Sequence, residues 1–216
     1  MLCALVAAML SLTACAPELS IKAYGAEGTT MSFLTGFSES AARTLRSLIG
    51  AATGVEIDEA MPIFAPQDIH KVLEAAGFTK IEAKNVSPTT FNATATYENL
   101  RIGEFVKTGA LTRTANSLTL TLGPRQFWTL YALSDEETQL YLDMLMIPAL
   151  SGESLTPAEY TALLASLYGV VFENEITDGA LSITLSSPDG SKRTTAKISL
   201  GEILTLTKEK SWTVTW

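Results

Sequence analysis

Cys15 is the residue of this 216-residue chain that most clearly suggests a chemical reaction, because its thiol follows a short apolar run and two small residues. Residues 2–12 are almost wholly apolar, with Ser11 the only interruption. A helix that crosses the hydrocarbon core of a bilayer needs about 20 residues, so this run is too short to span a membrane. Its length matches the apolar region of a secretory signal, which is about 7–15 residues long. The run therefore indicates an exported protein.

Residues 12–15, in the order Leu-Thr-Ala-Cys, resemble the lipobox of bacterial lipoproteins. The resemblance implies attachment of a diacylglycerol to the thiol of Cys15, cleavage just before this residue, and acylation of the new amino terminus. It also implies a signal peptide over residues 1–14 and a lipidated cysteine with a short tether over residues 15–18. No Lys or Arg precedes the apolar run, which departs from the usual signal. The alternative is a buried amino-terminal helix with Cys15 as a small core residue.

Lipidation would place the protein in the cell envelope, anchored to a bacterial membrane and facing the periplasm or the exterior. Two or three acyl chains anchor a protein stably, whereas one chain is marginal. The tether after Cys15 is short, because at about 3.3–3.6 Å per residue it reaches little more than about 10 Å. A net charge of -8 would make contact with anionic headgroups repulsive. We therefore expect an upright domain that is tethered to the membrane and not embedded in it.

Composition excludes several classes of function for this chain. It has 15 basic and 23 acidic residues, and the basic ones are scattered singly, whereas nucleic-acid binding requires a clustered basic face. Cys3 lies in the predicted leader and Cys15 at the predicted anchor, so the mature chain would have no free thiol for a disulfide, a metal or a nucleophile. About 202 residues follow the leader, enough for one large or two small domains.

Catalytic and metal-binding candidates are few. His70, the only histidine, lies on a predicted helix without the spaced serine and acid of a catalytic triad, and we expect it at the surface or at the boundary of the apolar stripe. The acidic candidates are Glu56, Asp58 and Glu59, Asp135 with Glu136 and Glu137, and Glu173 with Glu175. The last two alternate along the predicted strand over 170–176, and we expect them on its wet, solvent-exposed face. None of these groups has the spacing of a calcium loop, so we predict no metal and no cofactor. Two carboxylates could still meet in space as a hydrolase pair.

A polar strand offers the best candidate for binding. Residues 90–97 alternate in polarity, and the polar positions are Thr90, Asn92, Thr94 and Thr96. One interpretation is the solvent-exposed side of an antiparallel sheet. The other is a flat binding surface with aromatic anchors, which supply contact area at low entropic cost. The candidate anchors are Tyr97, Trp212 and Trp216.

The elements that would position these residues follow from periodicity. Apolar spacing and capping residues predict helices from Ser38, over 66–76, over 124–133, from Ser134 to Pro148, and from Pro157 to Gly169. Alternation predicts strands over 19–24, 29–35, 79–86, 91–97, 102–105, 118–122, 170–176, 181–185, 200–203 and 212–216. Together these elements indicate an α+β fold, with helices packed on one face of antiparallel sheets.

Two long stretches of the chain match each other. Residues 65–69 align with residues 156–160 at an offset of 91, and each segment begins a helix with a proline and an acidic residue. We therefore expect two α+β repeats over 19–116 and 117–216, each of roughly one strand, two helices and three strands. Shared composition alone is the alternative. The layout is similar to the tandem repeat of the β-lactamase inhibitor protein, and the short tether resembles uncharacterised spirochaete lipoproteins; neither likeness implies a function.

The sequence thus predicts a non-enzymatic, lipid-anchored envelope protein whose task is binding, either to a protein partner in the envelope or in a surface interaction. Two alternatives stay open. One is a carrier or sensor of a small apolar ligand, held between helices and sheet near Met144, Met146 and Leu150. The other is a hydrolase that uses a carboxylate pair without a recognisable motif.

Overall fold

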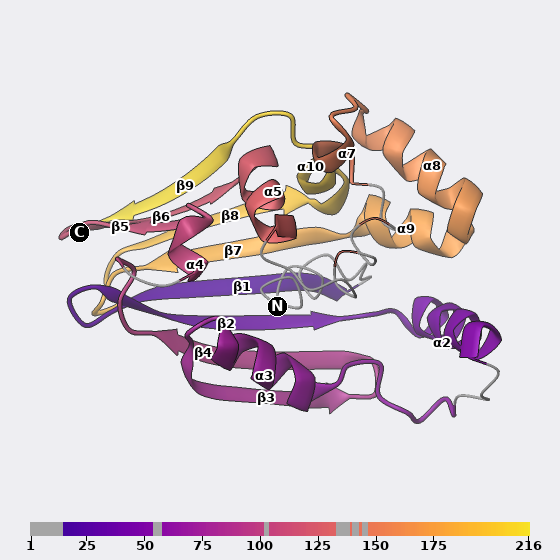
Figure 1. Ribbon diagram of the computed structural model, residues 1–216, viewed down its shortest axis with the longest axis horizontal. Helices are drawn as coiled ribbons and strands as arrows, with labels where there is room; N and C mark the ends of the chain where they lie inside the picture. Colours follow the sequence, from indigo (N-terminus) through magenta and orange to yellow (C-terminus); the bar gives the residue numbers. More distant parts are fainter. Residues whose placement is uncertain (1–14, 54–57, 102–103, 133–138, 140–142, 144–146) are drawn as a thin grey trace.

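The computed structural model describes most of the chain that follows the predicted leader (Figure 1). The described residues are 15–53, 58–101, 104–132, 139, 143 and 147–216. The predicted signal peptide, residues 1–14, lies outside them, as does most of the predicted helix from Ser134. Helices and strands are mixed along the described chain, so the predicted α+β class is confirmed.

A six-stranded sheet runs through the middle of the molecule in the order β3-β4-β2-β1-β7-β8. Its strands are β1 (Cys15–Tyr24), β2 (Gly28–Gly36), β3 (Thr79–Ser87), β4 (Thr90–Tyr97), β7 (Ala180–Ser186) and β8 (Arg193–Ser199). β1 and β7 are parallel, whereas the other neighbouring strands are antiparallel. β1 therefore lies inside the sheet, between β2 and β7 (Figure 1).

Alternation of apolar and polar residues gives this sheet one buried face. In β1, Leu19 and Ile21 are buried, whereas Ser20 and Lys22 are exposed. Successive side chains of a strand point to opposite sides of the sheet, so this pattern separates core from solvent. On the buried face, Phe91 of β4 has no exposed surface.

A second, three-stranded sheet has the order β5-β6-β9, and its neighbouring strands are antiparallel. Its strands are β5 (Leu111–Arg113), β6 (Ser117–Leu122) and β9 (Lys210–Thr215). The hydroxyl oxygens of Thr119 and Thr213 are hydrogen-bonded at 2.8 Å. Those of Thr121 and Ser211 are hydrogen-bonded at 2.9 Å. The Thr194 hydroxyl of β8 donates to the carbonyl of Thr213 at 2.9 Å, so the small sheet lies beside the edge of the large one.

Helices lie to one side of the large sheet and at one end of it (Figure 1). They include α2 (Glu39–Thr53), α3 (Pro66–Ala75), α4 (Glu104–Lys107), α5 (Pro124–Ala132), α7 (Pro148–Ser151), α8 (Pro157–Tyr168), α9 (Val170–Asp178) and α10 (Leu200–Leu204). α3 packs against β3, while α9 contacts α8, α2 and α10. Within the described part of the chain, no helix is both long enough and apolar enough to cross a membrane.

Capping residues start α8 where the sequence predicts it. The Thr156 hydroxyl accepts a hydrogen bond from the Glu159 amide at 3.3 Å, and the Glu159 carboxylate accepts one from the Thr156 amide at 2.8 Å. The Thr156 amide first, and then the Thr156 hydroxyl, which also donates to this carboxylate at 2.8 Å, lower the pKa of Glu159. Pro157 occupies the first turn, where its missing N–H has no cost. The helix ends at Gly169, whose φ of +92° favours glycine.

The predicted strand over 170–176 is wrong, because these residues belong to α9. Glu173 and Glu175 are two positions apart after the apolar run 170–172, which in the sequence favours one exposed side of a strand. In the structure Ile176 is buried as part of a helix that packs against α8 across the turn at Gly169. The pair Asp178-Gly179 is typical of a tight turn between strands, but here Asp178 ends α9 and Gly179 precedes β7. Packing between helices therefore overrides the local pattern.

One further predicted strand is a short helix, and the described part of another is helical as well. Residues 200–203 lie in α10, where the Ser199 hydroxyl accepts a hydrogen bond from the Glu202 amide at 3.1 Å. The order Ser-x-x-Glu is a helix-start signal, and this signal prevails over the apolar residues around it. Residues 104–105 begin α4, while 102–103 lie outside the described residues. β5 and β8 have no counterpart among the strands predicted from the sequence.

The predicted arrangement of the chain in two α+β repeats is not confirmed. β7 and β8 follow residue 117, yet they extend the same sheet as β1 to β4. The order helix, helix, strand, strand, helix, strand does occur twice, from α2 to β5 and from α8 to β9. Shared order without shared sheet pairing is weak support for a duplication. The repeat boundaries at 116 and 117 therefore stay predictions.

The turn between β7 and β8 is organised by one ionised carboxylate. Asp189 Oδ1 accepts hydrogen bonds from the Ser187 hydroxyl at 2.6 Å and from the Ser191 amide and hydroxyl at 3.0 and 2.9 Å. The Ser187 hydroxyl first, and then the two Ser191 donors, lower the pKa of Asp189 to about 2.

We expect this turn to keep its arrangement at an unusually low pH. Because the folded-state pKa of Asp189 is depressed, its contribution to stability is present above the ordinary pKa of 3.8 and is lost as pH falls through about 2. The measurement is a pH titration of the Ser191 amide chemical shift, with an expected midpoint near 2. In the variant Asp189→Asn this transition should vanish. A midpoint at the ordinary value would contradict the prediction.

Candidate functional site

Strand register brings a row of hydroxyl groups together on one face of the six-stranded sheet. Residues directly opposite each other on neighbouring strands lie on the same side of a sheet. From β4 to β8, the opposed residues are Thr94, Ser32, Ser20, Thr184 and Thr195. We call these five residues the hydroxyl row. Neighbouring strands are about 4.8 Å apart, so the row extends over about 19 Å.

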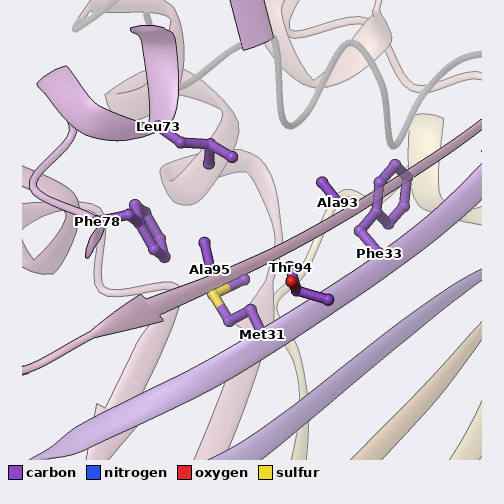
Figure 2. Close-up of a pocket in the computed structure, with 7 residues that line it drawn as sticks. All are labelled: Met31, Phe33, Leu73, Phe78, Ala93, Thr94 and Ala95. Atoms are coloured by element: carbon purple, nitrogen blue, oxygen red, sulfur yellow. The ribbon is translucent and has the colours of Figure 1, made fainter. Parts of the chain in front are cut away.

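The hydroxyl row lies on the face of the sheet that α3 does not cover. Figure 2 shows Ala95 of β4 pointing toward Leu73 of α3, whereas Thr94 points to the other side of the strand. Two members of the row are exposed and three are half-buried. The row is therefore accessible from solvent.

The hydroxyl groups of the row are not used by the fold. Within the described residues, none of the five side chains has a hydrogen bond to another protein group. The small sheet differs, because there Thr119 bonds to Thr213 and Thr121 to Ser211. Each hydroxyl of the row therefore keeps one donor and two acceptor positions for solvent or a ligand.

Two flanking rows complete what we call the polar face. On one side the opposed residues are Lys84, Asn92, Leu34, Glu18, Ser182 and Lys197. On the other side they are Thr96, Thr30, Lys22, Ser186 and Arg193. The Oδ1 atom of Asn92 is buried without a hydrogen-bond partner among the described residues. Leu34 is the single large apolar residue in these rows.

The polar face carries positive charge in an acidic protein. Its four basic residues are Lys22, Lys84, Arg193 and Lys197, and its two acidic residues are Glu18 and Glu82, which is opposite Thr94. All six of these charged side chains are exposed. The face thus has a formal charge of about +2, whereas the whole chain has -8.

The structure places the predicted polar strand on this face and adds residues that the sequence analysis missed. Thr90, Asn92, Thr94 and Thr96 share one side of β4, although Thr96 is only 5% exposed. The other members of the hydroxyl row come from β1, β2, β7 and β8. Alternation within each of these strands was the available signal, but the order of the strands was not readable from it.

The predicted aromatic anchors lie elsewhere. Tyr97 is 2% exposed and packs edge-to-face on Phe78 with ring centroids 5.0 Å apart, so its side chain belongs to the core and not to an exposed binding surface. Trp212 and Trp216 are half-buried at the small sheet. The guanidinium of Arg113 lies 5.8 Å from the centroid of the Trp216 ring. A binding role for these two tryptophans stays a prediction.

Cys15 is the first residue of β1, and its backbone pairs with Gly36 of β2. The predicted tether over 15–18 therefore belongs to the strand, with an irregular register between Cys15 and Glu18. The strand start predicted at Leu19 is corrected, because β2 extends far enough to pair with the earlier residues. The large sheet begins at the predicted site of lipidation.

His70 and most of the acidic candidates form no shared site in the described chain. His70 is exposed on α3, and Glu59 forms an ion pair with Arg43 at 3.3 Å. Glu56 and residues 135–137 lie outside the described residues. Among the residues that the structure describes, no group of three His, Cys, Asp or Glu side chains could hold a metal ion.

Glu175 was predicted on the wet face of a strand and is instead buried in α9, with 3% of its surface exposed. Its carboxylate accepts a hydrogen bond from the Ser38 hydroxyl. The same hydroxyl accepts a hydrogen bond from the Ala41 amide at 3.1 Å in the first turn of α2. A carboxylate at this end of a helix is favoured by the helix dipole. The contact therefore joins α9 to the start of α2.

Cavities give the predicted apolar carrier little room under α3. The space there is lined by Met31, Phe33, Leu73, Phe78, Ala93, Thr94 and Ala95 (Figure 2). It has a water-accessible volume of about 10 Å³, whereas sites for small molecules occupy about 300–1,000 Å³. A wider groove of about 320 Å³, open to solvent, is lined in part by Trp128, Tyr131 and Leu150. Met144 and Met146 lie outside the described residues.

Comparison with known proteins adds no assignment, since no family model matches this chain and no curated protein matches it either. The polar face and the position of Cys15 are therefore the features that bear on function.

Proposed function

We propose that this protein is a non-enzymatic, lipid-anchored binding protein of the bacterial cell envelope, and that the polar face of its large sheet contacts the partner. The observation that carries the proposal is the hydroxyl row, whose donors and acceptors have no protein partner among the described residues. Polar groups that are not needed by the fold and are gathered on one accessible face are available for recognition.

The position of Cys15 supports an upright orientation. A lipid on this residue would hold the end of β1, a strand inside the sheet. β1 has ten residues, so at about 3.3 Å per residue it extends about 33 Å from the anchor. The strands would then run roughly along the membrane normal. The polar face would point sideways, parallel to the membrane surface, where a partner could reach it.

The carrier alternative has one observation in its favour. Trp128, 51% exposed, and Tyr131 line the open groove near α5 and α7. The Tyr131 hydroxyl donates to the Asp143 carboxylate at 3.1 Å, so the groove contains a polar group as well. An exposed tryptophan beside a groove suits a small apolar ligand, and we keep this as the second candidate.

The anchoring part of the proposal is tested by the variant Cys15→Ser expressed in a bacterium that processes lipoproteins. A serine has no thiol for the thioether, so we expect nearly all of the protein to lose labelled fatty acid and to leave the membrane fraction. The measurement is metabolic labelling with a fatty acid together with fractionation. The matched control is Cys3→Ser, which removes the other thiol and should leave both labelling and membrane association unchanged. Retention of labelled Cys15→Ser in the membrane would contradict the anchor.

A further inference from the structure

We propose that the ligand of the polar face is an extended, negatively charged polysaccharide. This inference rests on the proposed binding function and names the chemical class of its partner. It is carried by the juxtaposition of a continuous row of unpartnered hydroxyls with an exposed basic rim.

The hydroxyl row matches a ligand that is itself rich in hydroxyl groups. Each serine or threonine hydroxyl can donate one hydrogen bond and accept two, and sugar hydroxyls have the same capacity. Opposed strands repeat the row at about 4.8 Å, so donors and acceptors recur along about 19 Å of the face. A polymer that lies across the strands can contact several members of the row at once.

The chemistry of the face disfavours a protein partner. Protein interfaces take most of their affinity from a few buried aromatic or apolar anchors. Among the described residues of the three rows, Leu34 is the single large apolar side chain and no aromatic ring occurs. The aromatic ring of Tyr97 is buried on the opposite side of the sheet. The face can therefore bind a ligand mainly through hydrogen bonds and charge–charge interactions.

The basic rim selects a ligand with negative charges. Exchanging a hydrogen bond with water for one with a ligand gives only a modest net gain, so hydroxyl contacts alone give limited affinity. Lys22 and Arg193 flank the hydroxyl row on one side, and Lys84 and Lys197 lie at the two edges of the other flanking row. Carboxylate or sulfate groups on a polysaccharide would pair with these four exposed cations. Repeated units would add affinity by raising the effective concentration of each further contact.

Binding is tested with purified, detergent-solubilised protein and three polymers of similar length, measured by calorimetry. The probes are polygalacturonate, which carries a carboxylate on each sugar, neutral dextran, and polyglutamate as an acidic peptide. We expect polygalacturonate to bind, longer fractions to bind more tightly, and dextran and polyglutamate to bind at least about ten-fold more weakly. Raising the salt from about 0.1 M to about 1 M shortens the screening length from about 10 Å to about 3 Å and should remove most of the affinity.

Removal of hydroxyls separates recognition from folding. The double variant Thr94→Val and Thr184→Val keeps the shape of both side chains and loses two hydroxyls of the row. We expect about ten-fold weaker binding of polygalacturonate and an unchanged melting temperature, because no described hydrogen bond is lost. The matched control is Thr119→Val with Thr213→Val, which removes a bonded pair in the small sheet. This control should lower the melting temperature and leave the affinity unchanged.

Removal of charge tests the basic rim in the same assay. The double variant Lys22→Gln and Arg193→Gln should weaken polygalacturonate binding about ten-fold and make the remaining binding less dependent on salt. The control Lys208→Gln removes a positive charge outside the three rows and should have no such effect.

Several outcomes would overturn the inference. Equal binding of dextran would exclude a role for charge, and equal or stronger binding of polyglutamate would assign the face to an acidic protein segment. No binding of polygalacturonate, or unchanged binding in the Thr94→Val and Thr184→Val variant, would remove the polysaccharide altogether. These failures are distinct from failure of the anchor, which is measured separately by the behaviour of Cys15→Ser.

Discussion

Replacing Gly28 by alanine is expected to lower the free energy of unfolding by about 3 kcal/mol. A Cβ atom at this position would lie 2.5 Å from the carbonyl oxygen of Tyr97 and 2.6 Å from that of Glu98. Both are backbone atoms at the end of β4, which is hydrogen-bonded to β2, so neither can move without disturbing the sheet. The close approach of β2 to the chain after β4 therefore requires a residue without a side chain.

Gly25 provides the matched control in the same hairpin. Its φ of +56° also favours glycine, but a Cβ atom there meets nothing within 4 Å. The variant Gly25→Ala should therefore cost only the backbone strain, about 1 kcal/mol. Both variants are measured by chemical denaturation with the wild type. Equal losses of stability in the two variants would contradict the steric explanation for Gly28.

Substitution of Arg113 should also cause a large loss of stability, because this residue joins the small sheet to the first hairpin of the large sheet. Its Nη1 atom donates to the carbonyls of Tyr24, at 2.7 Å, and Gly28, and its Nη2 atom donates to the carbonyl of Gly25 at 2.7 Å. Burial lowers the pKa of the Arg113 guanidinium, and the carboxylate of Glu27 counteracts this. We expect Arg113→Ala to lower the free energy of unfolding by about 2–3 kcal/mol, since hydrogen bonds to a charged donor are lost together.

Two further variants distinguish this contact from a general effect of charge. Arg113→Lys keeps the charge, but one ammonium group cannot reproduce a planar fork that reaches three carbonyls, so we expect it to recover less than half of the loss. Arg101 pairs with Glu27 at 3.0 Å while its side chain is 76% exposed. Arg101→Ala should cost no more than about 0.5 kcal/mol. Wild-type stability of Arg113→Lys in urea denaturation would refute the role of the fork.

Local signals in the sequence predicted the elements that depend on local interactions. The capping box of Thr156 and Glu159 indicates the start of α8, and the alternation in 118–122 indicates β6. Where a local pattern conflicts with packing, the prediction fails, as it does over 170–176, where a second helix packs on α8. The pairing of β1 with β7 has no local signal, because the two strands are joined only through the tertiary fold.

Only the part of the candidate site that depends on local pattern could be predicted from the sequence. Alternation placed Thr94 on a polar side of its strand, but it did not reveal that Ser20 and Thr184 would lie beside it. Alternation itself places Tyr97 on the apolar side of β4 with Phe91, and its ring packs on Phe78 in the core, so it is not an exposed anchor of the polar side. A row that crosses several strands depends on their order, and strand order is a property of the whole chain.

The parallel pair of β1 and β7 has a consequence for how the molecule assembles. Glu18 pairs with Ser182, so two segments from opposite ends of the chain must meet before the inner part of the sheet is complete. Contacts between residues so distant in sequence require closure of a long loop, which slows folding. A newly made chain will therefore stay incompletely folded until residues 180–199 have been synthesised. The export that we propose would require the chain to cross a membrane as an extended polypeptide, and this delay would preserve the state in which translocation is feasible.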